Sequence, residues 1–235
     1  MTVLLLRLAA PLQSWGVASR FARRETQQYP SKSGILGLIA AAQGRRRTDP
    51  IEDALRGLAF GVRIDQPGRL VRDFQVALSI DKSRSYPLSQ RYYLADAVFL
   101  AAVEGDRGLI EGIREALRQP AFPLYLGRRS CPAAEPLLVE PLIEESLVDV
   151  LHTAEWQASR WYRRSQYQRV RLPIYRDLLD IDPAEQLRER VRDVPLSFDP
   201  ARRDYGWRTV VADFTTVVNP DGRSEHQPMA ALGGE

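Results

Sequence analysis

The chain has 235 residues, of which 44% are hydrophobic and 27% charged, enough for one large domain or for a domain with an extension. Its net charge is +3, and its basic residues include only two lysines, Lys32 and Lys82, so arginine supplies nearly all of the positive charge. One cysteine and two histidines exclude an intrachain disulfide and a cysteine- or histidine-rich metal site, so we expect no metal and no cofactor.

Hydrophobic periodicity divides the chain into alternating strands and helices. Ser31 or Ser33 can cap the first helix, and Asp106 begins the second. In chain order the expected elements are strand 2–10, loop 11–30, a helix closed by Gly44, strands 58–64 and 74–80 joined as a hairpin by the turn 65–68, a projection 81–92, strand 93–103, a helix ended by Pro120, loop 122–132 and strand 137–139. Apart from one extra strand, this is the split βαβ order of ferredoxin-like domains, which many RNA-recognition domains share.

The balance of charge reverses after residue 134. Residues 135–155 carry six acidic side chains and no lysine or arginine, whereas residues 156–176 carry six arginines and no acid. The reversal predicts a domain over 1–145 and an extension over 146–235, with a tail that frays from about residue 219. The arginines and aromatic residues of 156–176 suit either an RNA surface or a protein partner.

Templates for catalysis and for membrane insertion are absent from the sequence. It holds no Gly-Lys-Ser/Thr phosphate loop, no His-Glu-x-x-His pair and no Gly-x-Ser-x-Gly turn. General acid–base catalysis most often uses histidine, and His152 and His226 lie far apart along the chain. We therefore expect no enzymatic activity, with a ribonuclease that relies on Tyr, Arg and Lys as the alternative. No apolar run approaches the roughly 18 residues of a membrane span, so we expect a cytoplasmic protein.

The entrance of the first helix, Tyr29 to Gly34, is the first candidate anion site. Arginine binds phosphate through two parallel hydrogen bonds, but a GC-rich genome also enriches arginine, so the position of each charge matters more than the number. A helix N-terminus directs free N–H groups at an anion, and Ser31 and Ser33 add hydroxyl donors. An ordinary serine cap explains the same residues equally well, and both interpretations can hold.

Two further loops combine basic side chains with glycine or tyrosine. Gly127, Arg128 and Arg129 can direct backbone N–H groups and guanidinium groups at adjacent phosphates, with a solvated turn as the alternative. The projection 81–92 interleaves basic side chains with tyrosines that can stack on bases, with a plain hairpin tip as the alternative.

Four segments that occur in order, Leu12–Gly16, Tyr29–Leu38, Arg91–Ala97 and Leu126–Pro132, resemble the Cas-five (CasD) subunits of type I-E CRISPR Cascade complexes. The late segment Asp193–Phe198 and Arg208 fit the same family, and the resemblance extends to about residue 216. It implies an α+β fold, with a ferredoxin-like (RRM/RAMP) domain, a β-hairpin thumb at about 79–93 and a largely β C-terminal extension.

The resemblance also implies a role. Such a subunit caps the 5′ handle of the CRISPR RNA and contacts the backbone (Cas-seven) subunit and the large subunit, and it meets target DNA only indirectly. A separate Cas-six subunit cuts the precursor RNA in type I-E complexes, whereas a Cas-five relative cuts it in type I-C. The residues we expect to bind RNA are Gln13, Ser14, Trp15, Arg23, Arg24, Tyr29, Ser31, Lys32, Ser33, Lys82, Arg84, Tyr86, Arg91, Tyr92, Gly127, Arg128, Arg129 and Ser130.

Overall fold

A computed structural model of the chain describes residues 1–16, 23–183 and 186–223. These residues form more strand than helix. In chain order the elements are β1 (Thr2–Ala9), β2 (Leu12–Gln13), β3 (Arg23–Arg24), α1 (Lys32–Ala42), α2 (Asp53–Arg56), β4 (Ala59–Gln66), β5 (Arg69–Gln75), β6 (Ser89–Ala95), β7 (Val98–Gly105), α3 (Arg107–Arg118), β8 (Leu138–Ile143), α4 (Leu147–Thr153), α5 (Arg160–Ser165), β9 (Arg169–Asp177), β10 (Arg188–Ser197) and β11 (Asp204–Val218). None of the helices in the described ranges is long and apolar enough to cross a bilayer.

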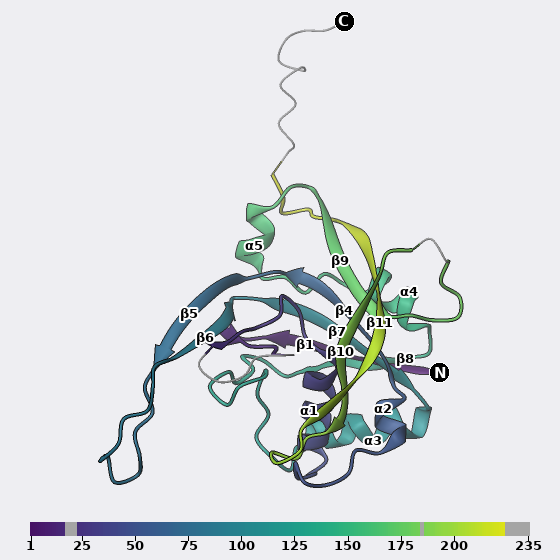
Figure 1. The fold of residues 1–235 in the computed structure, drawn as a ribbon. Helices are drawn as coiled ribbons and strands as arrows, with labels where there is room; N and C mark the ends of the chain where they lie inside the picture. The colour runs from purple at the N-terminus through teal and green to yellow at the C-terminus, as the bar shows by residue number, and fades with distance from the viewer. Residues whose placement is uncertain (17–22, 184–185, 224–235) are drawn as a thin grey trace, which may run out of the picture.

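A seven-stranded antiparallel sheet forms the centre of the molecule (Figure 1). Its strand order is β10-β11-β9-β4-β7-β1-β8. Helices α1 and α3 pack on one face of the sheet, and the short helix α4 packs on the other face against β4 and β7. Both faces of the central strands are therefore covered, which explains why β1 and β7 are almost continuously apolar.

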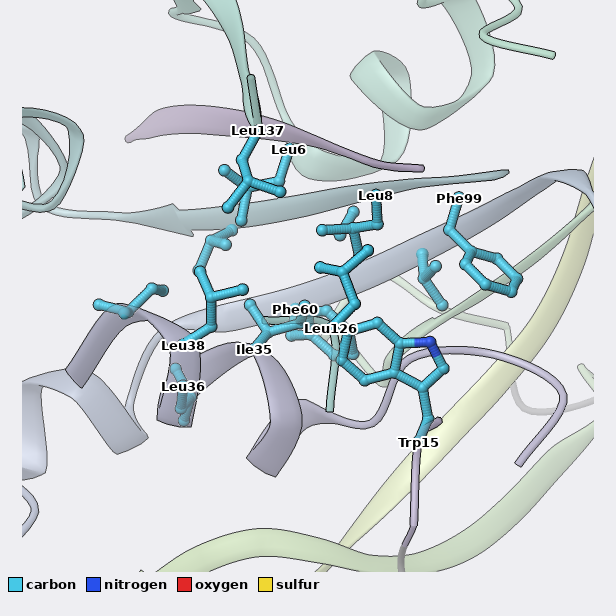
Figure 2. Close-up of a cluster of buried hydrophobic side chains, with 14 of the residues drawn as sticks. Leu6, Leu8, Trp15, Ile35, Leu36, Leu38, Phe60, Phe99, Leu126 and Leu137 are labelled. Carbon is cyan, nitrogen blue, oxygen red and sulfur yellow. The ribbon is translucent and has the colours of Figure 1, made fainter. Parts of the chain in front are cut away.

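Strand β1 lies at the heart of the core. Leu4, Leu6 and Leu8 point toward α1 and α3, while Val3 and Leu5 point toward α4. Figure 2 shows Leu6 and Leu8 above the side chains of α1, with the indole of Trp15 closing one end of the cluster. The predicted strand at 2–10 and the two predicted helices are confirmed: Ser31 caps α1, Gly44 follows it with a positive φ of 78°, and Asp106 caps α3.

The predicted pairing of 58–64 with 74–80 is wrong. Strand β4 pairs with β7 and β9, whereas β5 pairs with β6 in a second, smaller sheet that also holds β2 and β3. At the turn between β4 and β5, Gly68 has a φ of 72°, and a Cβ there would lie 2.5 Å from the carbonyl oxygen of Ala95. The predicted strand at 74–80 is also wrong, because β5 ends at Gln75 and residues 76–80 contribute only an isolated bridge at Leu78. Alternation of apolar residues therefore fixed neither the extent of this strand nor its partner.

The β5–β6 hairpin projects from the body of the molecule (Figure 1). It spans residues 69–95 and is longer than the predicted thumb at 79–93. The predicted strand at 93–103 is divided because Asp96 has a positive φ of 57°, which ends β6 before β7 begins. The apolar side chains of Phe74, Val76, Leu78 and Ile80 are exposed, so their alternation does not mark a face buried within this chain.

The segment after residue 146 continues the central sheet. Strand β9 pairs with β4, and β11 and β10 follow it to the edge of the sheet. The expected fraying does not begin at residue 219, because Asn219 is buried and its side-chain amide donates to the carbonyl oxygens of Arg163 and Tyr167. Residues 224–235 lie outside the described ranges.

A buried cluster of charges fastens this extension to α1. The guanidinium of Arg208 donates to both carboxylate oxygens of Asp193, at 2.6 and 3.0 Å, and to Asp177 at 2.7 Å. The ammonium of Lys32 donates to Asp177 at 2.8 Å, and the backbone N–H of Lys32 donates to Asp193 at 2.8 Å. Two cations and two carboxylates thus join α1, β9, β10 and β11 at one point.

We expect Arg208→Ala to destabilise the fold by roughly 3–5 kcal/mol, because it leaves buried carboxylates without their partner. Urea unfolding followed by circular dichroism measures the change. The matched control is Arg192→Ala, which removes an arginine of the same sheet whose side chain is 55% exposed and pairs with Asp204. Exposed pairs contribute about 0–1 kcal/mol, so equal losses in the two variants would contradict the role assigned to the cluster.

Candidate nucleic-acid interface

A cleft of about 930 Å³ opens beside α1, where four segments of the chain meet. Its walls are one side of α1 with the residues just after it, the loop 122–129, the turn that follows β2, and the connection between β10 and β11 with the start of β11. No acidic residue of the described chain lines it. Its basic lining consists of Arg45, Arg46, Arg47, Arg129 and Arg203, and its aromatic lining includes Phe122, Tyr125, Phe198 and Tyr205.

Most of the cleft arginines are available to an external anion. Arg45 pairs with Glu52 at 2.7 Å and donates to the side chain of Gln43. Arg46, Arg47, Arg129 and Arg203 have no carboxylate partner within salt-bridge distance among the described residues. A group of unpaired guanidinium ions beside aromatic rings matches the requirements of a single-stranded nucleic acid, which offers phosphates and flat bases.

The helix entrance differs from the expected phosphate site. Ser31 caps α1 by accepting the N–H of Gly34 at 3.2 Å, and the hydroxyls of Ser31 and Ser33 are 3.3 Å apart. The anion at the N-terminus of α1 is the carboxylate of Asp193, and Lys32 is buried in the charge cluster. The chain therefore supplies its own anion there, and only Ser31, Ser33 and Gly34 still line the cleft.

Gln13, Ser14 and Trp15 are buried; Ser14 and Trp15 line the cleft, whereas Gln13 is not part of its lining. The amide of Gln13 donates to the carbonyl oxygens of Leu8 and Ala97, and its oxygen accepts the indole N–H of Trp15 at 3.1 Å. Trp15 packs so closely on α1 that a Cβ at position 34 would lie 2.9 Å from its ring. These residues shape the cleft from behind, and their polar groups are already hydrogen-bonded within the protein.

The Gly-Arg-Arg loop divides its two arginines between different tasks. The guanidinium of Arg128 donates to the carbonyl oxygens of Tyr92 at 3.1 Å and Arg24 at 2.9 Å, and it lies 4.5 Å above the ring of Tyr93. Arg128 thus ties the loop to β3 and β6, while Arg129 lines the cleft. Ser130 is exposed beside the buried Cys131.

The remaining predicted residues lie outside the cleft. Arg23 pairs with Glu25 at 2.9 Å and stacks over the ring of Tyr92 at 5.3 Å. Tyr29 stacks on Tyr175 with ring centroids 4.2 Å apart, and burial is the main cause that raises the pKa of Tyr29 to about 12. The exposed Arg24 is on β3, Arg91 is on β6, and the hairpin tip carries Lys82, Arg84 and Tyr86.

The sequence analysis missed several residues that line the cleft. Arg203 and Tyr205 reach the cleft because β10 and β11 bring their connection back against α1, where Phe198 lies 3.4 Å from the Cβ position of Gly37. The only local signal in the sequence was the closeness of Arg203 to Tyr205 along the chain. For Arg45, Arg46 and Arg47 the run of positive charge was visible, but its position beside the loop 122–129 was not.

We expect Gly127→Ala to cost about 1–3 kcal/mol or more of stability and to distort the cleft. Gly127 has a φ of 90°, and a Cβ would lie 1.7 Å from the carbonyl oxygen of Ser14. Thermal unfolding measures the loss. Gly112→Ala on the exposed side of α3 meets nothing within 4 Å, and we expect this control to gain up to about 1 kcal/mol. A Gly127→Ala protein with wild-type stability would overturn this account of the loop.

Comparisons with known proteins place the chain in one family. Residues 3–211 match the family model described as CRISPR-associated protein (Cas_Cas5). The chain is 34% identical over 155 residues to the CRISPR system Cascade subunit CasD of Escherichia coli (strain K12), and the match covers 58% of this chain and 69% of that protein.

Two solved structures also match. A chain of a solved CRISPR RNA-guided surveillance complex superposes with a TM-score of 0.74 at 34% identity, covering 92% of this chain and 91% of that chain. A crystal structure described as a Cas protein superposes with a TM-score of 0.69 at 32% identity, covering 94% and 97%. The chain belongs to the Cas-five family of CRISPR-associated proteins.

Proposed function

We propose that this protein is a non-catalytic subunit of a Cascade-type CRISPR complex and that it caps the 5′ handle of the CRISPR RNA. The observation that carries the proposal is the acid-free cleft, in which Arg46, Arg47, Arg129 and Arg203 surround aromatic rings. Family membership supplies the identity of the nucleic acid, because one relative is a Cascade subunit and another is part of an RNA-guided surveillance complex.

The arrangement of the N-terminal half supports a ferredoxin-like domain of the RRM/RAMP type. The order β1, α1, β4, β7, α3, β8 along the chain combines with the spatial order β4-β7-β1-β8 in the sheet. This combination supports the split βαβ arrangement. On this interpretation the β5–β6 hairpin is the thumb, and β9–β11 enlarge the sheet at its far edge.

Within the cleft, the proposed division of work follows from side-chain chemistry. Unpaired arginines contact the phosphates of the handle, and Tyr125 and Tyr205 offer planes for its bases. Arg128 holds the loop in place through three contacts within the protein, so its effect on RNA is indirect.

The thumb supports contact with a neighbouring subunit. Phe74, Val76, Leu78 and Ile80 expose 66%, 52%, 56% and 105% of their surface. Exposed apolar groups in this number on a projecting hairpin are characteristic of a protein interface. We propose that this surface meets the Cas-seven backbone subunit, that the large subunit docks elsewhere on the body, and that target DNA is met only through the assembly.

The surroundings of His152 support a non-catalytic role. One ring nitrogen contacts the carbonyl oxygen of Val148 at 2.8 Å, and the other lies 3.3 Å from the carboxylate of Asp213. Both nitrogens are thus occupied on the α4 side of the sheet, and His152 is not among the residues that line the cleft. The endoribonuclease alternative would need an acid–base group at the cleft from another residue type.

We expect the double variant Arg129→Ala/Arg203→Ala to weaken binding of the CRISPR repeat RNA at least about tenfold. Each lost phosphate contact lowers the slope of log affinity against log salt by about 0.7, so the slope should fall by about 1.4. Fluorescence anisotropy across a salt series measures both quantities. Arg107→Ala is the control, because this arginine is 69% exposed but already paired with Glu111. Unchanged binding by the double variant would refute the cleft as the RNA site.

We also expect no site-specific cleavage of precursor repeat RNA by the purified chain. The assay follows end-labelled RNA on a denaturing gel, with and without divalent metal ions. Site-specific cleavage that Tyr125→Phe or Tyr205→Phe abolishes would establish the ribonuclease alternative instead, because these two tyrosines line the cleft.

A further inference from the structure

Strands β9 and β11 continue beyond the central sheet as a two-stranded ribbon (Figure 1). Their pairing keeps one register from Asp177↔Val210 to Arg169↔Val218. In contrast, β4 pairs with β9 only at residues 174–176, and the ladder between β10 and β11 ends at Val211. Within the described chain, residues 169–173 and 214–218 therefore pair only with each other.

One face of this ribbon is covered and the other is bare. Leu172 packs with Trp156 and Ala158 in a small core, which Tyr162 of α5, Val170 and Val217 complete. Directly paired residues of neighbouring strands share a face, and successive residues alternate between faces. The opposite face therefore presents one set of side chains, all of them exposed: Arg169, Arg171, Pro173, Phe214, Thr216 and Val218.

The bare face is held in shape from its far end. The N–H of Asn219 donates to Gln168 at 2.8 Å, and its side-chain amide donates to Arg163 at 2.8 Å and to Tyr167 at 3.0 Å. Asn219 is 1% exposed. Since the end of the ribbon is anchored in this way, a ligand meets a surface that needs little ordering on binding.

The chemistry of the face is basic and planar. The guanidinium of Arg171 lies 3.3 Å from the centroid of the Phe214 ring, and that ring keeps 44% of its surface exposed. Arg169 stands two residues away on the same face, a separation of about 6.7 Å along a strand. Neither arginine has a carboxylate partner within salt-bridge distance among the described residues, and the run 156–176 contains no acid.

We propose that this ribbon face binds a second segment of single-stranded nucleic acid, apart from the handle in the cleft. An unpaired base stacks on the outer plane of the Arg171 guanidinium, which Phe214 supports from behind. The adjacent phosphate contacts Arg169, because the spacing of the two arginines is comparable to that of successive phosphates along an extended strand. Such contacts read no base edges, so binding is independent of sequence.

The test uses the full chain and two labelled probes of equal length, an oligouridylate RNA and an oligothymidylate DNA. Both probes are measured by anisotropy over a salt series in an Arg129→Ala/Arg203→Ala background, which removes the cleft contribution. Adding Arg169→Ala/Arg171→Ala should lower affinity by roughly tenfold, and it should reduce the salt slope by about 0.7 because only Arg169 contacts a phosphate. Comparable losses for both probes identify a general single-strand site, and a loss confined to one probe identifies RNA or DNA as its ligand.

Arg107→Ala/Arg118→Ala is the control, since these two arginines are also exposed but are already paired with glutamates. We expect it to leave both probes unaffected, and ultraviolet crosslinks should map to Arg171 or Phe214. An unchanged salt slope after Arg169→Ala/Arg171→Ala overturns the proposal. So does a variant that binds both probes normally but no longer joins the complex, which would make the face a protein-docking surface. Either result leaves the cleft proposal standing, because that proposal is tested with Arg129 and Arg203.

Discussion

The carboxylate of Asp193 at the N-terminus of α1 is the contact on which the rest of the molecule depends. It accepts the first free N–H of the helix and the guanidinium of Arg208, while Asp177 joins Arg208 to Lys32. A helix N-terminus attracts an anion, and here the anion belongs to a strand more than a hundred residues later in the chain. This contact places the β10–β11 connection against α1, and the cleft exists because of that placement.

The same cluster explains why an arginine-rich composition is ambiguous. Arg208 and Arg128 act within the protein, one in the charge cluster and the other on backbone carbonyl groups. Arg63 is completely buried and donates to Asp65, to the carbonyl oxygen of Leu151 in α4, and to two carbonyl oxygens just after α4. Arginine suits such positions because its five donors satisfy several acceptors at once while the charge persists. Arginines that lack such partners among the described residues, including Arg129 and Arg169, are the ones we propose to contact external phosphates.

Elements with strong local signals were predictable from the sequence. Helices α1 and α3 carry apolar residues at helical spacing together with serine or aspartate caps, and β1 is an unbroken apolar run. Pairing partners were not predictable, because alternation along one strand is the same whichever neighbour it joins. The loop 126–130 was identified as important from its glycine and arginines, but the inward direction of Arg128 depends on Tyr92 and Arg24, which lie far away in sequence.

The sequence by itself determined β1, α1 and α3, the arginine-rich composition and the family, because periodicity, caps and motifs are local properties of the chain. Only the tertiary structure decided which basic side chains face outward. The helix entrance at Ser31 looked like a phosphate site until Asp193 was found in it, and Arg203 gained a role only when β10 and β11 returned to α1. The physical reason is that a charge becomes available or occupied through partners distant in sequence, and folding alone brings those partners together.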